Sequence, residues 1–178
     1  MAVRRKPSIE GAVTSRSSSR QGSTSQDDSV QEFLWNIVSI GSYFEEISFV
    51  WAQMLGVNVH QWMILMAVKD LDRGGGISVK GVSAKLHGDP SFVTSQSKSL
   101  EKLGFMRRTT SSEDARVVLM SLTDKACKEI ANLQNMQQPL RDSIFSEFDE
   151  KALRNINEKL SALSERFQKA AKRLAAEL

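Results

Sequence analysis

Apolar residues recur at helical spacing over most of this 178-residue chain, with one exception in the middle. Between residues 29 and 56 they fall three and four positions apart, and the S-x-x-E pattern that begins at Ser29 predicts a capped helix start. Further helical runs cover residues 61–71, 124–145 and 149–178. We therefore expect a mainly α-helical protein with long helices at both ends of the chain.

The exception is the segment 77–122, where short apolar runs alternate with Gly, Pro and polar clusters. Its order predicts a short strand, two short helices, and two strands joined by a polar loop. Asp89 suits the N-cap of the second short helix, Pro90 its first position, and Gly104 the left-handed position after its end. This outline is that of a winged helix-turn-helix, which places one helix in a DNA groove.

The second short helix, residues 89–103, is expected to have two different faces. Its predicted core stripe is Val93, Leu100 and Leu103. The opposite face carries hydroxyls followed by lysines, namely Ser91, Thr94, Ser95, Lys98 and Lys102. Hydroxyls bond base edges or phosphates and Lys pairs with guanine or phosphate, so this face suits the major groove. A plain solvated helix face would have the same composition.

The polar loop 109–116 is the second candidate contact with DNA. A long hairpin that carries one Arg near its end can reach the adjacent minor groove, whose negative potential attracts a guanidinium. Arg116 is that residue, and Asp114 is placed to orient it or to brace the loop. Charge supports this interpretation, because residues 79–116 hold seven basic and four acidic side chains while the net charge of the whole chain is only +3.

Several classes of function are disfavoured by what the sequence lacks. No apolar run approaches the roughly 20 residues of a membrane span, and no apolar segment follows the basic N-terminus as in a secretory signal. A single Cys cannot form a disulfide within the chain, which fits a reducing cytoplasm. One Cys and two His do not match a structural zinc spacing, so we expect no metal and no cofactor. The glycines at 74–76 lack the Lys-Ser/Thr of a phosphate loop, and no catalytic set is evident, so we expect no enzyme.

The helices at the two ends are expected to serve assembly. The first, residues 29–56, is apolar on more than one side and lies in a stretch, 21–68, without any Lys or Arg. The last has a heptad-like seam of Leu153, Ile156, Leu160, Leu163, Phe167, Ala170 and Leu174. A second copy of the chain is the simplest partner for both, and packing of the last helix on the chain's own first helix is compatible with that. Residues 1–28 are polar and basic, and we expect them to be disordered.

With these features in view, the chain resembles the MarR family of bacterial transcription regulators. The resemblance rests on Gln61-Trp62, on the segment 86–104, on the Asp114-x-Arg116 pair, and on the L-x-x-L-T exit from the wing at 119–123. It covers roughly residues 30–175 in element order. It implies one domain over residues 29–178, in which dimerisation helices (29–56 and 124–178) flank a winged helix-turn-helix lobe (57–123).

The resemblance also implies a function. It suggests a homodimer in the bacterial cytoplasm that represses transcription by binding a pseudopalindromic double-stranded DNA operator. The minor-groove role carries over to Arg116, and the recognition-helix role to Ser91, Thr94, Ser95 and Lys98. One departure is the Ser95-Gln96 pair, where many members have an Arg, which leaves more of the contact to Lys98 and to hydroxyls. Another is Gly81, an unusual residue in the supporting helix.

Members of this family commonly release DNA when a small aromatic or lipophilic effector binds between the dimer helices and the lobe. The candidate lining here is Tyr43, Phe44, Trp51, His60, Trp62 and Met66, although ordinary core packing also accounts for such a set. Residues 21–68 hold no Lys or Arg, and only His60, Lys69 or Arg73 could substitute as the cation. We therefore expect an effector that is neutral or that keeps its anionic group near the edge of the lobe.

Two alternatives stay open from the sequence. One is a winged-helix module that binds another protein rather than DNA. The other is a thiol-based redox-responsive regulator that acts through Cys127, the single cysteine, which lies in the fifth helix. Because Cys is among the most buried residue types, we expect Cys127 to be a buried structural thiol.

Overall fold

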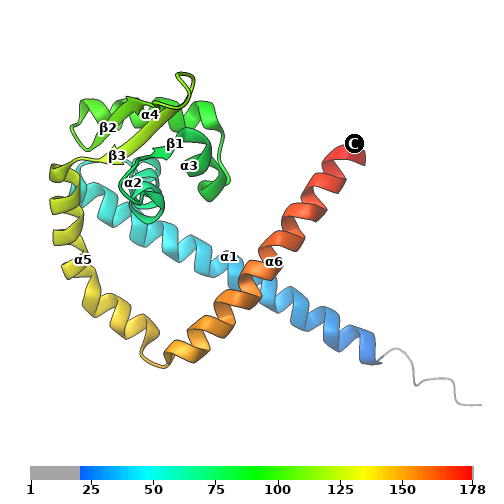
Figure 1. Cartoon of the computed structure of the whole chain (residues 1–178). Helices are drawn as coiled ribbons and strands as arrows, with labels where there is room; N and C mark the ends of the chain where they lie inside the picture. The colour runs from blue at the N-terminus through cyan, green and yellow to red at the C-terminus, as the bar shows by residue number, and fades with distance from the viewer. Residues whose placement is uncertain (1–20, 178) are drawn as a thin grey trace, which may run out of the picture. The chain divides into compact units, whose positions relative to one another are not determined.

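The structure, a computed structural model, describes residues 21–177, with side chains from residue 25 onward. The expected order of elements is confirmed, and the protein is mainly α-helical with one small sheet (Figure 1). In chain order the elements are α1 (Gln21–Leu55), α2 (Val59–Leu71), β1 (Ile77–Ser78), α3 (Val79–Leu86), α4 (Pro90–Lys102), β2 (Met106–Thr110), β3 (Val118–Leu122), α5 (Asp124–Phe145) and α6 (Glu150–Glu177).

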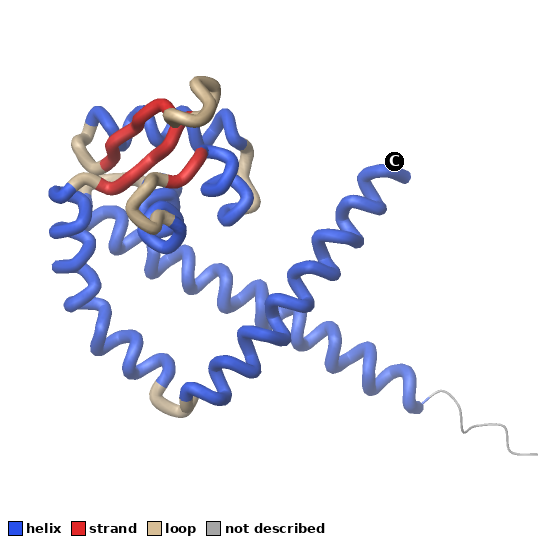
Figure 2. Tube along the Cα trace, viewed as in Figure 1, coloured by secondary structure: helices blue, strands red, loops and turns tan. Residues whose placement is uncertain are grey.

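The sheet is antiparallel, with the strand order β1-β3-β2. Strands β2 and β3 form the wing, in a register that pairs Met106 with Leu122 and Thr110 with Val118. The short β1 adds to the other edge of β3 through the pair Ile77 and Met120. Figure 2 shows the three strands in red and the loop that joins β2 to β3 rising beyond them.

The core lies where α2, α3, α4 and α5 meet the sheet. Its fully buried side chains come from all of these elements: Ile64, Leu65, Val68, Val82, Val93, Leu100, Met120 and Ile130. Complete burial of one such side chain is worth about 1.5–3 kcal/mol, so these eight residues fix the relative positions of the elements that carry them. Val93 and Leu100 belong to α4, and their burial decides which face of that helix remains outside.

Local signals account for the ends of the short helices. Asp89 caps α4 with Pro90 in its first turn, and Gly104 has a φ of +75°, as expected. Ser78 caps α3. Gly81, unexpected inside a helix, has a steric reason. A Cβ at this position would lie 2.8 Å from the Cδ1 atom of Ile77, so the glycine lets β1 and α3 approach closely.

Two expected helix starts are wrong. Helix α1 begins at Gln21, and Ser29 lies inside it, where its hydroxyl donates to the Ser25 carbonyl (2.9 Å) instead of capping. Residues 21–28, which we expected to be disordered, therefore belong to α1, and residues 1–20 lie outside the described residues. Helix α2 starts at Val59, two positions before the expected Gln61, because Asn58 and Gln61 form a reciprocal capping box.

Other differences concern burial and helix breaks. Leu103 was expected in the core stripe of α4 but is 42% exposed. Ser97 was not expected in that stripe but is fully buried. A proline inside a helix is expected to kink or split it, but α5 continues through Pro139 without being split.

The end helices carry apolar side chains that are not covered within the chain. Residues up to Val50 and residues from Trp51 onward form two compact units, and each is described by itself. In the first unit, α1 exposes Phe33, Trp35, Val38, Ile40, Tyr43, Phe44, Phe49 and Val50 among others. In the second unit, α6 has no buried residue, and most of its seam, including Ile156, Leu160 and Phe167, is exposed. No helix between residues 21 and 177 is long and apolar enough to cross a membrane.

Candidate nucleic-acid interface

The start of α4 is fixed by one carboxylate. The Oδ1 atom of Asp89 accepts hydrogen bonds from the backbone N–H groups of Ser91 (2.7 Å) and Phe92 (3.1 Å). The hydrogen bond from Phe92, and after it the one from Ser91, hold the pKa of Asp89 below its ordinary value, and the Phe92 bond has the larger effect. Since Asp89 accepts these two backbone N–H groups, they are not free to bind a phosphate, and contacts outside the helix fall to the exposed side chains of its first turn.

The outer face of α4 carries the polar residues that the helical period predicts. Ser91, Ser95, Lys98 and Lys102 are exposed, and Thr94 is half-buried at the edge of that face. The Thr94 hydroxyl donates to the Pro90 carbonyl (2.8 Å), which leaves its oxygen available as an acceptor. The two lysines stand on the same face as the serines, one turn apart.

The wing tip is a braced turn rather than a loose loop. The Asp114 carboxylate accepts the backbone N–H of Arg116 (2.9 Å), and the Asp114 carbonyl accepts that of Val117 (2.9 Å). Ser111 closes the other side, with its N–H donating to the Val117 carbonyl (2.9 Å) and its hydroxyl accepting the Glu113 N–H (3.2 Å). Of the two roles considered for Asp114, bracing the loop is the one it performs. Arg116 is exposed at the end of this turn.

Helix α4 is also held from the side of α2. The Gln61 amide donates from Nε2 to the hydroxyl of Ser99 (3.0 Å), and the Asn58 amide lies 3.4 Å from the Oε1 atom of Gln96. The ring of His60 meets that of Phe92 edge to face, with centroids 5.2 Å apart. The first turn of α2 therefore touches α4 at three positions, 92, 96 and 99, which share one flank of the helix.

The other flank of α4 is joined to the wing. Glu101 accepts the backbone N–H of Arg108 on β2 (3.2 Å), and its second carboxylate oxygen lies 3.8 Å from the Arg108 guanidinium. The Arg108 side chain is only 12% exposed, and its Nε atom is buried without a partner. This contact therefore links α4 directly to the first strand of the wing.

The end of α4 is tied to the start of α5. The Thr123 hydroxyl donates to the Gly104 carbonyl (2.7 Å) and also accepts the N–H of Ala126 as the N-cap of α5. Lys125 donates to the Leu103 carbonyl (3.1 Å) and stands 4.3 Å from the centre of the Phe105 ring. Nothing in the sequence near Thr123 or Lys125 indicates these links between the two helices.

The six residues expected around an effector lie in different surroundings. Tyr43 and Phe44 are exposed on α1, and His60 is exposed on α2 beside Phe92. Trp62, by contrast, is buried in the core of the lobe with only 4% of its surface exposed. Trp51 and Met66 are half-buried against the same core.

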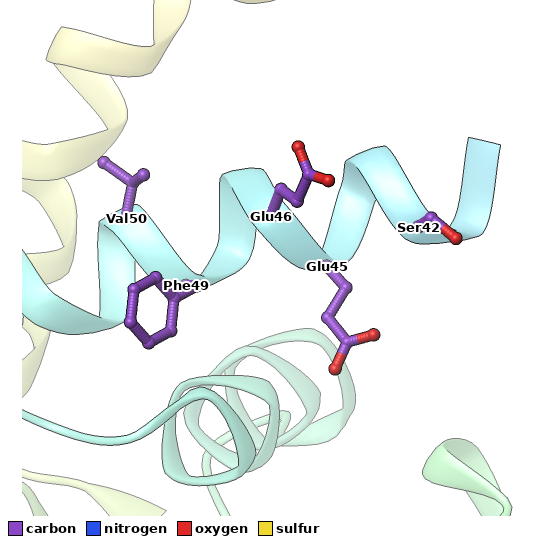
Figure 3. Close-up of a pocket in the computed structure, with 5 residues that line it drawn as sticks. All are labelled: Ser42, Glu45, Glu46, Phe49 and Val50. Carbon is purple, nitrogen blue, oxygen red and sulfur yellow. The ribbon is translucent and has the colours of Figure 1, made fainter. Parts of the chain in front are cut away.

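Near Tyr43 and Phe44 in the sequence, α1 has an open surface depression lined by both apolar and acidic side chains (Figure 3). Its lining is Ser42, Glu45, Glu46, Phe49 and Val50. Figure 3 shows Glu45 and Phe49 leaving one side of the helix, and Glu46 and Val50 the other. The lining therefore combines apolar side chains with two carboxylates and no cation. Within the described part of the chain, no cluster of three or more His, Cys, Asp or Glu side chains is placed to hold a metal ion.

The expectation for the single cysteine is wrong. Cys127 is exposed on α5, because Ala126, Ile130 and Leu133 form the buried stripe of that helix and direct position 127 away from the core.

A helix-turn-helix whose outer face is polar and basic, followed by a braced antiparallel wing, defines the lobe as a winged-helix DNA-binding domain. Residues 57–118 match the sequence model of the MarR family. This match covers the winged lobe and leaves the helices at both ends of the chain outside it. A curated relative, the HTH-type transcriptional regulator SarZ of Staphylococcus epidermidis, is 27% identical over 94 residues, which are 53% of this chain. The chain spans 59% of the length of that relative.

Solved structures share the fold over a longer part of the chain. CouR from Rhodococcus jostii, determined with p-coumaroyl-CoA bound, is similar over 74% of this chain and 90% of its own, with a TM-score of 0.64 and 17% identity. A MepR variant from S. aureus, determined with a bound oligodeoxyribonucleotide, is similar over 76% of this chain and 97% of its own, with a TM-score of 0.51 and 13% identity. At these identities the similarity shows the fold alone.

Proposed function

We propose that this protein is a sequence-specific DNA-binding transcriptional regulator that acts as a homodimer on a pseudopalindromic operator. The observation that carries the proposal is the pairing, on one lobe, of the exposed Ser and Lys face of α4 with a braced wing tip that presents Arg116. The first would enter a major groove, and the second the minor groove beside it. SarZ, which is 27% identical over 94 residues, is named a transcriptional regulator, and the MepR variant was determined with an oligodeoxyribonucleotide.

The DNA contacts are tested by binding measurements at several salt concentrations. Fragments of genomic DNA that bind the purified protein are selected, and affinity for one selected site is compared with affinity for random DNA. Replacing Arg116 by Ala should weaken binding and reduce the salt slope by about one, as expected for one lost phosphate or groove contact. Arg154→Ala removes the same charge from the exposed face of α6 and serves as the matched control. Equal affinities of wild type and Arg116→Ala would remove the wing from the proposal.

The homodimer is supported by the exposed apolar faces of α1 and α6. A seam of large apolar side chains spaced by three and four residues, without a buried member, is costly to leave in water and is the pattern that a second helix covers. Leu160 lies in this seam and Lys159, its neighbour, lies outside it. Analytical ultracentrifugation should find a dimer in wild type and in Lys159→Glu, but a monomer in Leu160→Glu. A dimer that tolerates Leu160→Glu would contradict the use of this seam.

We further propose that the regulator is a repressor released by a small aromatic or lipophilic effector. Tyr43, Phe44, Trp51, His60 and Met66 remain the candidate contacts, together with the buried Trp62 as a supporting residue. CouR, with the same fold, was determined with p-coumaroyl-CoA. The carboxylates of Glu45 and Glu46 on α1 strengthen the expectation that an anionic group is not buried there.

A matched pair of probes tests that expectation. Salicylamide and salicylate have the same ring and differ mainly in charge at neutral pH. The neutral probe should raise the melting temperature and weaken operator binding at lower concentrations than the anion. Tyr43→Ala should reduce the response to the neutral probe. If salicylate acts more strongly and its effect is lost in Tyr43→Ala, an anion is accommodated among the side chains of α1 and the expectation fails.

A further inference from the structure

One side chain of α4 differs in chemistry from the small hydroxyls around it. Phe92 stands in the first turn of the helix and is 43% exposed. Its neighbours Ser91 and Ser95 are small and polar, and the next residue, Val93, points into the core. A large apolar ring left in water at this position costs hydrophobic free energy, and the lobe does not bury it.

The ring is held rather than free. His60, in the first turn of α2, meets Phe92 edge to face with the ring planes 89° apart. The turn that carries His60 is itself fixed by the Asn58–Gln61 capping box. Phe92 therefore keeps one orientation on the flank of α4, and the part of the ring that His60 leaves uncovered faces outward.

The position of Phe92 decides what that uncovered surface can meet. In a helix-turn-helix, the residues near the N-terminus of the recognition helix contact base edges. The apolar group on the floor of the major groove is the C5-methyl of thymine, and Phe is one of the side chains suited to contact it. The hydroxyls of Ser91 and Ser95 and the ammonium of Lys98 form hydrogen bonds, and the methyl of Thr94 belongs to a half-buried side chain, so Phe92 offers the large exposed apolar surface at this end of α4.

We propose that Phe92 is a specificity-determining residue that recognises a thymine methyl in each half-site of the operator. The inference rests on the proposed DNA-binding function and adds one base preference to it. His60 acts as a positioning residue, because it contacts Phe92 and keeps its ring in place. Removing one methyl from such a contact should weaken binding about fourfold in a half-site, and about 15-fold when it is removed from both half-sites.

The test replaces thymine by uracil, which keeps every hydrogen-bonding group of the base and lacks only the methyl. In a site selected by the wild-type protein, each symmetry-related pair of thymines is replaced in turn, and the dissociation constants of wild type and Phe92→Ala are measured. One replacement should weaken wild-type binding about 15-fold. For Phe92→Ala the same replacement should have no effect, although this variant binds the original site more weakly.

Leu103 offers a matched control. It is apolar, 42% exposed, and lies at the far end of the same helix, where eleven residues at 100° each bring it back to about the same flank. Leu103→Ala should keep the full penalty for uracil. Phe92→Leu, which preserves apolar contact, should keep part of it, and His60→Ala should reduce it without abolishing it. Circular dichroism checks that each variant is folded.

The results separate this inference from the proposed function. If the protein selects no site and its binding to DNA shows no salt dependence, the proposed function fails and the inference fails with it. If a site is selected but no uracil replacement weakens wild-type binding, or the penalty persists unchanged in Phe92→Ala, only the role of Phe92 is overturned. A penalty lost in Leu103→Ala as well as in Phe92→Ala would show a general change of α4, and would also overturn it.

Discussion

The contact between Glu101 on α4 and Arg108 on β2 should respond very differently to the loss of either partner. Glu101 is 43% exposed in its side chain, whereas that of Arg108 is 12% exposed, so the two groups differ in their access to water. Removing the carboxylate, as in Glu101→Met, leaves a guanidinium with five N–H donors almost buried, and its Nε atom already lacks a partner. The backbone N–H of Arg108 loses its acceptor as well.

The structure sets the size of the effect. A fully buried pair loses about 3–5 kcal/mol when one partner is removed, and a surface pair about 0–1. Glu101→Met lies between these limits, because one partner is buried and the other is not, and we expect a loss of about 2 kcal/mol. Arg108→Met removes the unpartnered Nε and leaves a carboxylate that water can reach and that keeps the backbone N–H. We expect it to change stability by no more than about 0.5 kcal/mol.

Urea unfolding followed by circular dichroism, at one protein concentration for all variants, measures these differences. The double variant Glu101→Met/Arg108→Met should recover most of the loss, since the buried charge is then gone. The reasoning is refuted if Arg108→Met costs as much as Glu101→Met, or if the double variant is as unstable as Glu101→Met alone. Either result would mean that the charge pair itself, rather than the burial of an unpaired guanidinium, determines the energy.

Three further variants test local features of the lobe. Gly76 has a φ of +78°, and a Cβ there would stand 3.1 Å from a side chain of β3. Gly76→Ala should therefore lower the free energy of unfolding, measured with urea, by about 1–2 kcal/mol. Gly75 has open space around it, so Gly75→Ala should change that free energy by less than about 0.5 kcal/mol. Thr123→Val loses both hydrogen bonds of its hydroxyl and should cost about 1–2 kcal/mol, whereas Thr123→Ser should retain them. The pKa of Asp89 is lowered in the folded state, so its contribution to stability is present above its ordinary value of 3.8 and is lost as the pH falls through the lowered value. Asp89→Asn should therefore show a smaller fall in melting temperature between pH 5 and about pH 2.5 than wild type does.

Helical spacing and cap chemistry predicted the lobe well because both are local. The Asp89-Pro90 pair sets the start of α4, and from there the 100° period places Ser91, Ser95, Lys98 and Lys102 on the face away from Val93. The predicted helix start at Ser29 was wrong because a serine near a helix start is compatible with two structures. A Ser can cap a helix or can donate back to the preceding turn inside one, and Ser29 does the second.

The misplaced cysteine has a related cause. Residue type favoured burial of Cys127, but the positions three and four apart on α5 that reach the core are Ala126, Ile130 and Leu133. A small Ala gives a weak apolar signal, but Ile130 and Leu133 set the phase of the helix that makes Ala126 the inward position. The period of the buried residues outweighs the average burial of any one residue type.

The contacts of α4 with α2 and α5 were beyond sequence reasoning, because each joins residues far apart in the chain. Gln61 and Ser99 are separated by 38 positions and Lys125 and Leu103 by 22, and nothing local to either partner names the other. These contacts depend on how the core elements pack, which the polar residues themselves do not determine.

Their arrangement bears on how an effector could act. Helix α4 is bonded on one flank to the first turn of α2, through Gln61, and at its end to the first turn of α5, through Thr123 and Lys125. Helix α2 follows α1 in the chain, and α5 leads into α6, so both attachments lie next to the helices that we assign to dimerisation. An effector acts only through different affinities for two arrangements of the protein. Because α4 is held at both attachments and packed on the core between them, a change in the angle of α2 or α5 moves the recognition helix as a rigid body. If the protein is a dimer that binds an effector, as we propose, we expect effector binding to change the spacing of the two α4 helices while the side chains on the outer face of α4 keep their own geometry.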